Sequence, residues 1–450
     1  MERLLEVLAG YRDRDAIIWA DRAHSYQWLT TRMADWADRC RRDGIEAGAV
    51  VGVRGDFSPD TVALFVALAQ RACVIVPLAA RGRPADDELL ELAEVEHSYT
   101  PLDGPERESR RYTTPASNGL YARLRATGHS GLVLFSSGTA GVRKAALHDL
   151  ERLLEPFLTK RRPYRALAFL VFDHIGGINT MLRVLSSGGC LVVPADRSPD
   201  RVLQAISDHR VELLPTSPSF LNLMLVSGAH ARYDLSSLRL VTYGTEPMPP
   251  ATLARLRAVL VDVDVRQTYG LSEVGILNTR SRGPDSVWVQ VGGPGFETRI
   301  VDGVLEIRAR SAMLGYLNAA SPFTSDGWFS TGDLVETEGQ YVRILGRATE
   351  MVNVGGRKVH PSIVENVLHE IDGVAEATVY GEKNALLGSI VCARIRPSGA
   401  GDHTDLVRRI KAHCRERLAP HEVPVRLVVG HEPHHGDRYK KIRSQESTGR

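Results

Sequence analysis

The 450-residue sequence has few cysteines, almost no net charge and no uninterrupted apolar segment of the length that a membrane helix needs. Its five cysteines are widely scattered and form no CxxC pair, which argues against a disulfide framework and a zinc knuckle, so we expect reduced thiols. With 56 basic and 54 acidic side chains, the formal net charge is +2. This balance gives no reason to expect nucleic acid or an anionic membrane surface as a partner.

The most apolar long segment, residues 61–80, is interrupted by Gln70 and Arg71. This interruption favours a buried helix followed by a strand over a membrane span. The N-terminal stretch is charged and amphipathic and has no apolar signal core. We therefore expect a cytoplasmic protein without membrane insertion.

Short β-branched runs alternate with amphipathic helical patterns through most of the chain. Examples of the runs are AVVGV (49–53), GLVLF (131–135) and VELLP (211–215), and amphipathic segments cover 201–210 and 250–260. Strand–helix alternation of this kind predicts α/β layers with mostly parallel sheets.

The pattern changes twice towards the C-terminus. From about Gly292, short strands with turn residues between them predict a compact β-rich part, and after Arg347 strands and helices alternate again. We therefore predict an α/β protein with two domains. A large N-terminal domain, residues 1–346, contains layered, mostly parallel sheets with helices and the small β-rich part, and a smaller, mobile α+β domain covers 347–450.

The segment FSSGTAGVRKAALH (135–148) follows an apolar run and is rich in small residues. Several of them offer backbone N–H groups or hydroxyls that suit phosphate oxygens, namely Ser136, Ser137, Gly138, Thr139 and Gly141. Lys144 adds a positive charge, but the spacing is not that of a Walker A loop. Taken alone, the segment fits either a phosphate cradle or a flexible strand-to-helix connection.

Two later segments carry suitable groups for a nucleotide and its metal. In QTYGLSE (267–273), Tyr269 offers a stacking face, and Glu273 is a hard oxygen ligand suited to Mg²⁺ beside phosphates. In STGDL (330–334), Asp333 is an acceptor-only carboxylate that suits hydroxyl groups. Each segment alone also fits an ordinary turn.

In order along the chain, these segments resemble the motifs of the adenylate-forming superfamily, which contains acyl- and aryl-CoA synthetases, adenylation domains of peptide synthetases and luciferases. The resemblance runs from about residue 130 to the C-terminus and is weaker before it. The segment 136–145 is similar to the signature [ST]-S-G-[ST]-T-G-x-P-K-G but departs from it at Ala140, Arg143 and Ala145.

The resemblance implies that ATP and Mg²⁺ bind at these segments. Catalytic roles fall on Thr139, Lys144 and Glu273, with Glu273 also as the metal ligand. The turn at residues 243–247 matches an adenine-contacting turn of the family, and Arg347 matches an arginine that reaches the ribose with Asp333. The implied nucleotide contacts are Ser136, Ser137, Gly138, Gly141, Gly244, Thr245, Glu246, Thr268, Tyr269, Gly270, Ser272, Asp333 and Arg347.

The resemblance also assigns roles to the C-terminal domain. A terminal lysine is expected to contact the acid and the α-phosphate: the K-x-x-R spacing favours Lys440, while the lysine-then-aliphatic order favours Lys441. Gly355 and Gly356 are expected to let a pantetheine arm pass close to the backbone. The tail histidines His434 and His435 are expected to face solvent.

The acid pocket of the family begins after the run ALAFLVF (166–172). His174 aligns with a family histidine, and Asp173 or His174 is expected to contact a polar substituent of the acid, although Asp173 also suits a helix N-cap. Two glycines are expected to leave room at this wall and three further residues to complete it: Gly176, Gly177, Thr216, Ser217 and Tyr243.

The resulting expectation is an ATP-dependent ligase that converts a small-molecule carboxylic acid into an acyl adenylate and then into a CoA thioester. The expected acid is aromatic or short, with or without an amino or hydroxy substituent. One alternative is a stand-alone adenylation enzyme that loads the phosphopantetheine of an acyl carrier protein or passes the adenylate to a nitrogen nucleophile. Another is a non-catalytic, nucleotide-binding regulatory protein.

Overall fold

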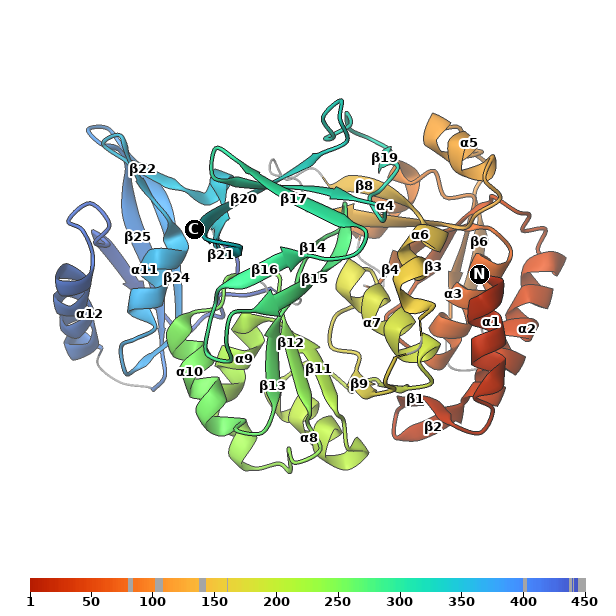
Figure 1. Ribbon diagram of the computed structural model, residues 1–450, viewed down its shortest axis with the longest axis horizontal. Helices are drawn as coiled ribbons and strands as arrows, with labels where there is room; N and C mark the ends of the chain where they lie inside the picture. Colours follow the sequence, from red (N-terminus) through yellow and green to blue (C-terminus); the bar gives the residue numbers. More distant parts are fainter. Residues whose placement is uncertain are drawn as a thin grey trace.

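A computed structural model describes residues 1–79, 84–101, 108–136, 143–159, 161–399, 403–436, 439 and 441–443. Within these residues the chain forms three seven-stranded sheets and one five-stranded sheet. The chain starts in the layers at the right of Figure 1, and the strands and helices of the smaller C-terminal domain lie at the left. The layered α/β architecture expected from the sequence is confirmed.

The first sheet has the strand order β13-β12-β11-β9-β10-β1-β2. Its pairs are parallel except for the β1–β2 hairpin. The strands are β1 (Asp15–Trp19), β2 (Arg22–Ser25), β9 (Arg165–Leu167), β10 (Cys190–Val192), β11 (Leu213–Thr216), β12 (Leu240–Tyr243) and β13 (Asp264–Gln267). Because parallel strands point the same way, β11, β12 and β13 end side by side at Thr216, Tyr243 and Gln267.

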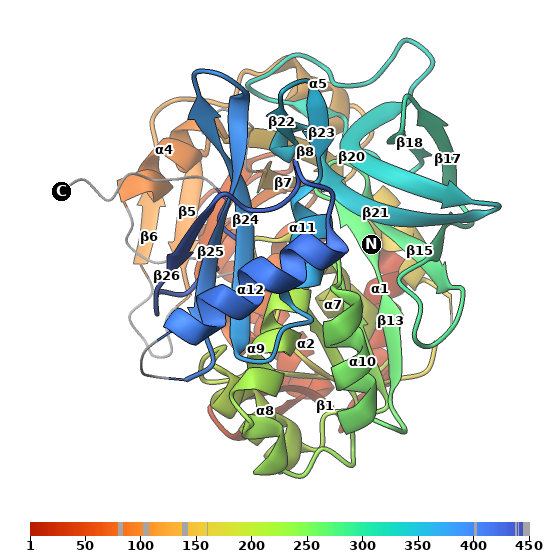
Figure 2. The same cartoon turned by 90° about the vertical axis from the view of Figure 1, so that its left-hand side faces the viewer.

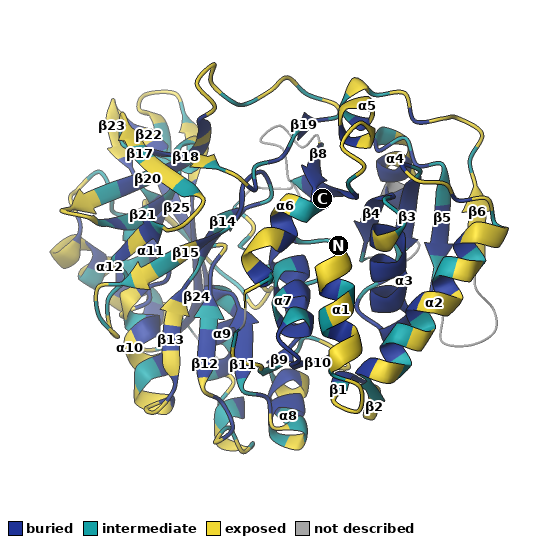
Figure 3. Ribbon diagram, turned by 45° about the vertical axis from the view of Figure 1, so that its right-hand side comes forward, coloured by how far each residue is buried: buried dark blue, intermediate teal, exposed yellow. Residues whose placement is uncertain are grey.

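The second sheet has the order β19-β8-β7-β4-β3-β5-β6 and a parallel centre. Its strands are β3 (Val50–Arg54), β4 (Val74–Leu78), β5 (His97–Thr100), β6 (Glu108–Arg111), β7 (Gly131–Ser136), β8 (Lys144–Asp149) and β19 (Gly315–Tyr316). The segment expected to form a buried helix and a strand does so, as α3 (Pro59–Gln70) and β4. Helix α2 (Tyr26–Arg42) covers α3 and presents its other side to solvent (Figure 3).

The third sheet is antiparallel, with the order β14-β15-β16-β21-β20-β18-β17. Its strands are β14 (Tyr269–Leu271), β15 (Gly275–Ser281), β16 (Val289–Gly292), β17 (Phe296–Val301), β18 (Val304–Ala309), β20 (Phe329–Glu338) and β21 (Tyr341–Arg347). The β-rich part therefore begins at Tyr269, well before Gly292, where the sequence pattern placed its start. The first of the missed strands, β14, contains only three residues, whereas β15 contains seven.

The fourth sheet is formed by strands after Arg347. It contains β22 (Val352–Val354), β23 (Arg357–Val359), β24 (Val374–Asn384), β25 (Gly388–Pro397) and β26 (Arg426–Val429). Helices α11 (Pro361–Leu368) and α12 (Thr404–Arg417) contribute Val364, Leu368, Ile410 and Cys414 to its apolar core (Figure 2). The domain boundary at residues 346–347 stays a prediction.

Most helices of the large domain begin at a residue that can accept hydrogen bonds from the first turn or at a proline. Ser25, Ser58 and Ser217 accept from the helix N–H groups of α2, α3 and α9. Among the described residues, no helix is both long and apolar enough to cross a membrane. The remaining helices are α1 (Glu2–Gly10), α4 (Pro84–Leu92), α5 (Gly119–Arg125), α6 (Leu150–Leu154), α7 (Ile175–Ser186), α8 (Pro199–His209), α9 (Pro218–Val226) and α10 (Pro250–Val259).

Buried sulfur and imidazole groups are a further feature of the core. All five cysteines are buried and unpaired, as expected from their scatter. Three histidines are also buried, His148, His369 and His434, so the expectation that His434 faces solvent was wrong. Its ring shares a hydrogen bond of 3.0 Å with Thr378, and its backbone N–H donates to Glu376 at 3.1 Å. These contacts fix the start of the C-terminal tail.

These histidines predict that stability falls on mild acidification. Burial lowers the pKa of His148 to about 4, of His369 to about 3 and of His434 to about 4, all from 6.5. Because the unfolded chain then binds protons more readily, the stabilisation is complete above pH 6.5 and is lost as the pH falls towards 4. Each histidine contributes a slope of up to about 1.4 kcal/mol per pH unit.

Urea unfolding at pH 7.5, 6.5 and 5.5 measures this slope. The variant His434→Gln keeps a polar side chain that does not titrate in this range, so it is expected to show a smaller loss between pH 6.5 and 5.5 than the parent protein. An unfolding free energy that does not change from pH 7.5 to 5.5 would contradict the prediction.

Candidate active site

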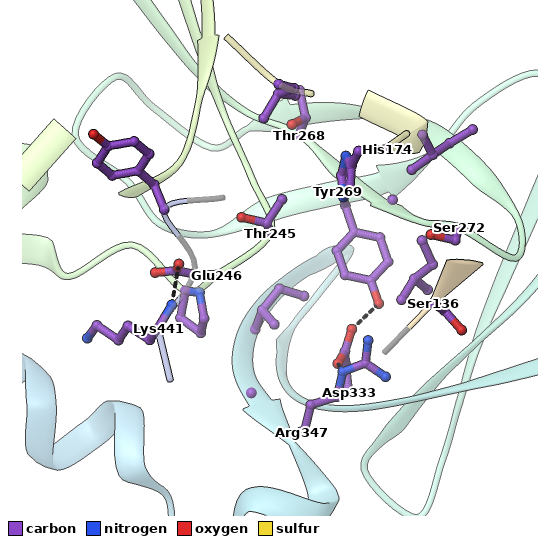
Figure 4. Close-up of a pocket in the computed structure, with 18 of the residues that line it drawn as sticks. Ser136, His174, Thr245, Glu246, Thr268, Tyr269, Ser272, Asp333, Arg347 and Lys441 are labelled. Atoms are coloured by element: carbon purple, nitrogen blue, oxygen red, sulfur yellow. Dashed lines mark hydrogen bonds and ion pairs between the residues drawn. The ribbon is translucent and has the colours of Figure 1, made fainter. Parts of the chain in front are cut away.

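A cavity of about 360 Å³ lies where the first sheet ends, facing the third sheet and the C-terminal tail. Figure 4 shows side chains from all of these parts pointing into it. Eleven of the residues expected from the sequence line this cavity: Ser136, His174, Thr245, Glu246, Thr268, Tyr269, Gly270, Ser272, Glu273, Asp333 and Arg347.

The predicted phosphate loop connects two antiparallel strands. Ser136 at the end of β7 lies opposite Lys144 at the start of β8. The connection is therefore strand-to-strand, and the alternative of a strand-to-helix connection was wrong. The other expected loop residues, Ser137, Gly138, Thr139 and Gly141, lie outside the described residues.

Lys144 and Glu273 are linked through Tyr316, which sequence reasoning missed. The Lys144 ammonium lies 5.1 Å from the centre of the Tyr316 ring, and the Tyr316 hydroxyl donates to Oε1 of Glu273 at 2.7 Å. Burial and the neighbouring Glu273 raise the pKa of Tyr316, which keeps its proton available for this bond. Glu273 itself is buried, and its carbonyl accepts from the N–H of Met313 at 2.8 Å. The carboxylate is thus held in one orientation.

Tyr269, Asp333 and Arg347 form a second group. Asp333 on β20 lies directly opposite Arg347 on β21, so the strand register itself brings the two charges together. Nε of Arg347 lies 2.8 Å from Oδ1 of Asp333, while the Tyr269 hydroxyl donates to Oδ2 at 2.5 Å (Figure 4). Burial, together with Asp333, raises the pKa of Tyr269. The tyrosine that was expected near adenine therefore also orients the carboxylate.

The turn after β12 brings two backbone segments very close. A Cβ at Gly244 would lie 2.7 Å from the Thr268 hydroxyl oxygen and 2.9 Å from the Thr268 carbonyl oxygen, so a side chain does not fit there. Thr245 then has a φ of 72°, in the left-handed region that β-branched residues rarely adopt. Backbone strain of this kind is concentrated at functional sites.

Glu246 holds the C-terminal tail against the cavity. Its Oε2 accepts from the Ser219 hydroxyl at 2.7 Å and its Oε1 from the backbone N–H of Lys441 at 3.1 Å. Burial raises the pKa of Glu246, although Lys441 partly opposes this effect. Tyr439 and Glu365, which sequence reasoning did not single out, also take part in the contacts of the tail. The Ser217 hydroxyl donates to the Tyr439 carbonyl at 2.9 Å, and the Lys441 ammonium lies 2.9 Å from Glu365.

Of the two candidate lysines, only Lys441 lies within the described residues. Lys441 lines the cavity, but its ammonium is paired with the buried carboxylate of Glu365. Lys440 lies outside the described residues, between Tyr439 and Lys441, both of which line the cavity. The choice of Lys440 stays a prediction.

On the acid side, His174 and not Asp173 caps helix α7. Nδ1 of His174 accepts from the N–H of Gly176 at 3.0 Å, so the ring proton of the neutral form lies on Nε2. Gly176 and Gly177 were expected to leave open space, but in the structure they allow close packing instead. A Cβ at Gly177 would lie 2.1 Å from the carbonyl oxygen of Val171, and one at Gly176 would lie 2.6 Å from Leu170. The expectation of room at this wall was therefore wrong.

A second cavity, of about 230 Å³, adjoins the first and shares Ile175, Gln267 and Thr268 with it. Thr216, Ser217 and Tyr243 were expected to line an acid pocket, but they line neither of these two cavities of the described chain. Their neighbours Pro215 and Thr242 line the smaller one. Side chains on a strand alternate between its two faces, so a shift of one residue moves an expected contact to the opposite side.

Gly355 and Gly356 form the two-residue turn between β22 and β23. Val354 pairs with Arg357, and the two glycines have φ angles of 56° and 83°. Tight hairpins of this type need positive φ at both central positions, which explains both glycines. Their role beside a pantetheine arm stays a prediction.

Two protein-family models match the chain, and one of them covers most of the residues that line the larger cavity. The model of the AMP-binding enzyme family matches residues 126–327, and that of the AMP-binding enzyme C-terminal domain matches 363–434. A 3-[(3aS,4S,7aS)-7a-methyl-1,5-dioxo-octahydro-1H-inden-4-yl]propanoyl:CoA ligase of Mycobacterium tuberculosis is 33% identical over 320 residues, which are 66% of this chain and 62% of that protein. A 2,3-dihydroxybenzoate-AMP ligase of Bacillus subtilis is 30% identical over 322 residues, 65% of this chain and 59% of that protein. The match thus spans less than two thirds of these relatives.

Solved structures share the fold. The crystal structure of an anthranilate CoA ligase in complex with anthranoyl-AMP has a TM-score of 0.83 at 19% identity, over 97% of this chain and 95% of that chain. An amide bond synthetase from Marinactinospora thermotolerans has a TM-score of 0.74 at 21% identity, over 97% and 96% of the two chains.

The strained backbone at Thr245 gives a prediction on stability. Thr245→Gly is expected to raise the free energy of unfolding by up to about 1 kcal/mol, because a left-handed residue other than glycine costs roughly 1–2 kcal/mol and added freedom of the unfolded chain offsets part of the gain. Urea unfolding measures the change. Thr245→Ala, which removes the hydroxyl but keeps Cβ, is the control and should give no gain; equal effects of both variants would contradict the strain argument.

Proposed function

The chain belongs to the AMP-binding enzyme family, and on this premise we propose that it activates a carboxylic acid with ATP and then transfers the acyl group to the thiol of CoA. The first step yields an acyl adenylate and pyrophosphate, and the second yields a thioester and AMP. The observation that carries the proposal is that Glu273, Asp333 and the C-terminal tail converge on one cavity. The adjoining cavity of about 230 Å³ suits a small acid.

The nucleotide lies in the larger cavity. Asp333 is an acceptor-only group that receives the ribose hydroxyls, and Tyr269 and Arg347 keep it in place through their short contacts. The triphosphate lies towards Ser136 and Lys144, at the two ends of the predicted phosphate loop. Lys144 supplies positive charge there, while Thr245 and the close-packed turn around it border the base.

Glu273 suits the magnesium ion that accompanies ATP. Proteins commonly bind Mg²⁺ through one or two carboxylates together with substrate phosphates and water. Glu273 is one such carboxylate, lines the cavity and is oriented by the hydroxyl of Tyr316. A magnesium ion held there would neutralise charge on the phosphates.

The reaction depends mainly on positioning and on compensation of charge. A carboxylate oxygen of the acid attacks the α-phosphorus, a new P–O bond forms, and the bond to the β-phosphate breaks as pyrophosphate leaves. Lys440 carries the charge that compensates the reacting oxygens, and Lys441 anchors the tail through Glu365. The C-terminal domain then rotates, and Gly355 and Gly356 approach the pantetheine arm of CoA.

Acid-dependent ATP–pyrophosphate exchange tests the first step. We expect exchange with at least one small aromatic or aliphatic acid of a broad panel, and we expect consumption of the free CoA thiol to depend on the same acid. Exchange without consumption of CoA thiol would favour a carrier protein or a nitrogen nucleophile as the acceptor. Nucleotide binding without exchange for any acid would favour a regulatory protein and contradict the proposal.

The two tail lysines are expected to behave differently when replaced. Lys440→Ala should slow exchange roughly 100-fold or more, the usual loss on removal of one group that stabilises transition-state charge, without a change in melting temperature. Lys441→Ala should cost about 2 kcal/mol of stability, because Glu365 loses a charged hydrogen-bond partner. Exchange kinetics and urea unfolding measure both effects. If Lys440→Ala were silent and Lys441→Ala abolished exchange at unchanged stability, the two roles would be reversed.

A further inference from the structure

The smaller cavity combines apolar walls with basic side chains. Its apolar wall comes from α7, from β11 and β12 and from β15. Three arginines from distant parts of the chain also line it: Arg161, Arg183 and Arg266. No aspartate or glutamate of the described residues is part of this lining.

Helix α7 relates the arginines to the nucleotide cavity. Its first residue, Ile175, borders both cavities, and Arg183 lies eight residues further along the same helix. With a rise of 1.5 Å per residue, this separation is about 12 Å along the helix axis. A ligand whose reacting carboxyl lies near Ile175 and Thr268 therefore reaches Arg183 with its opposite end.

Arg183 is held in a positive environment. It is half-buried, and its guanidinium lies 5.7 Å from the centre of the Tyr164 ring. Burial, followed by the nearby Arg161, lowers the pKa of Arg183, while Tyr164 opposes this effect and Arg266 adds a smaller lowering. Among the described residues, neither Arg161 nor Arg183 forms an ion pair with a carboxylate, whereas Arg266 pairs with Asp264.

Arg161 donates to the Pro156 carbonyl at 2.8 Å, but no carboxylate of the described residues compensates the charges of Arg161 and Arg183, and an anion bound between them would do so. Like charges repel, and removal of a charged group from water is unfavourable when the group is not paired. Arg183 lies in the last turn of α7, where the negative end of the helix dipole partly compensates its positive charge. The helix dipole does not explain why Arg161 and Arg266 also lie near Arg183. Guanidinium groups bind carboxylates with two parallel hydrogen bonds and are less strongly hydrated than ammonium groups.

We propose that the smaller cavity selects carboxylic acids that carry a second anionic group, which Arg183 and Arg161 bind at the end remote from the nucleotide. The inference rests on the proposed acid-activating function and names its substrate class, a compact acid with two separated anions. It replaces the expectation of an amino or hydroxy substituent read at Asp173 or His174.

A matched pair of acids tests this specificity: 3-phenylpropanoate and 3-(4-carboxyphenyl)propanoate, which differ only by the remote carboxylate. In ATP–pyrophosphate exchange, the diacid is expected to have a kcat/KM at least tenfold above that of the monoacid. Arg183→Met should reduce kcat/KM for the diacid by roughly 10- to 100-fold, the usual loss for a charged hydrogen bond, mostly through KM. The monoacid should be unaffected or improved.

The control variants separate charge from fold. Arg183→Lys should keep part of the preference for the diacid. Arg162→Met removes an exposed arginine that contacts Glu212 and lines neither cavity, and it should change nothing. Arg161→Met is the second test variant should Arg183→Met fail to fold, with the same expected loss for the diacid.

Two outcomes in the kinetics of these variants would overturn the inference. One is an unchanged ratio of diacid to monoacid activity in Arg183→Met and Arg161→Met. The other is a rise of KM for ATP or CoA alone in these variants, which would make the anion a phosphate of a cosubstrate.

The parent protein separates this inference from the proposed function. Exchange with monoacids without a preference for the diacid would contradict only this inference, whereas absence of exchange with every acid would contradict the proposed function. Thermal shift with the two acids gives a readout independent of turnover: stabilisation by the diacid that Arg183→Met does not abolish would also contradict the inference.

Discussion

The carboxylate of Glu365 is buried at the base of the C-terminal tail, and the tail itself supplies the charges that allow this burial. Lys441 and Arg443 each approach Oε2 at 2.9 Å, and the Val379 N–H donates to Oε1 at 3.0 Å. Burial alone would raise the pKa of Glu365, but the two cations outweigh it and bring the pKa to about 2. Buried ion pairs often add little net stability, yet an unpaired buried carboxylate is very costly. The interaction therefore determines where the tail lies.

The position of the tail in turn completes the larger cavity. With Lys441 fixed on Glu365, its backbone N–H meets Glu246 of the large domain. The ring of Tyr439 then packs against Phe169 and Phe220 at centre distances of 5.6 and 5.4 Å. The cavity thus has walls from both domains, and rotation of the C-terminal domain would have to break the contacts of the tail with the large domain. This coupling links the geometry of the larger cavity to the position of one buried carboxylate.

Sequence patterns predicted the layered fold and the parts of the site that lie within short motifs. Tyr269 and Asp333 are carried by segments whose residue types are recognisable locally. Tyr316 escaped notice because its importance comes from a contact with a residue 43 positions away in the chain. The error at Thr216 had another cause: the right strand was identified, but the face that each side chain occupies depends on register and not on composition. Arg183 stood in an ordinary helix, and only folding brings it near two other arginines.

The charges of the two cavities are arranged differently, and this difference acts on the orientation of an acid. Within the described part of the chain, four carboxylates in the larger cavity are balanced by four lysine or arginine side chains, while the charged residues that line the smaller one are all arginines. If the smaller cavity holds the acid, as proposed, an acid with a single anion would be attracted to those arginines by its only carboxylate, which would then point away from the larger cavity. An acid with two anions would bind the arginines with one end and present the other end for reaction. On this proposal the same guanidinium groups favour productive binding of a diacid and unproductive binding of a monoacid, so that specificity would come from misplacement of the wrong ligand as well as from attraction of the right one.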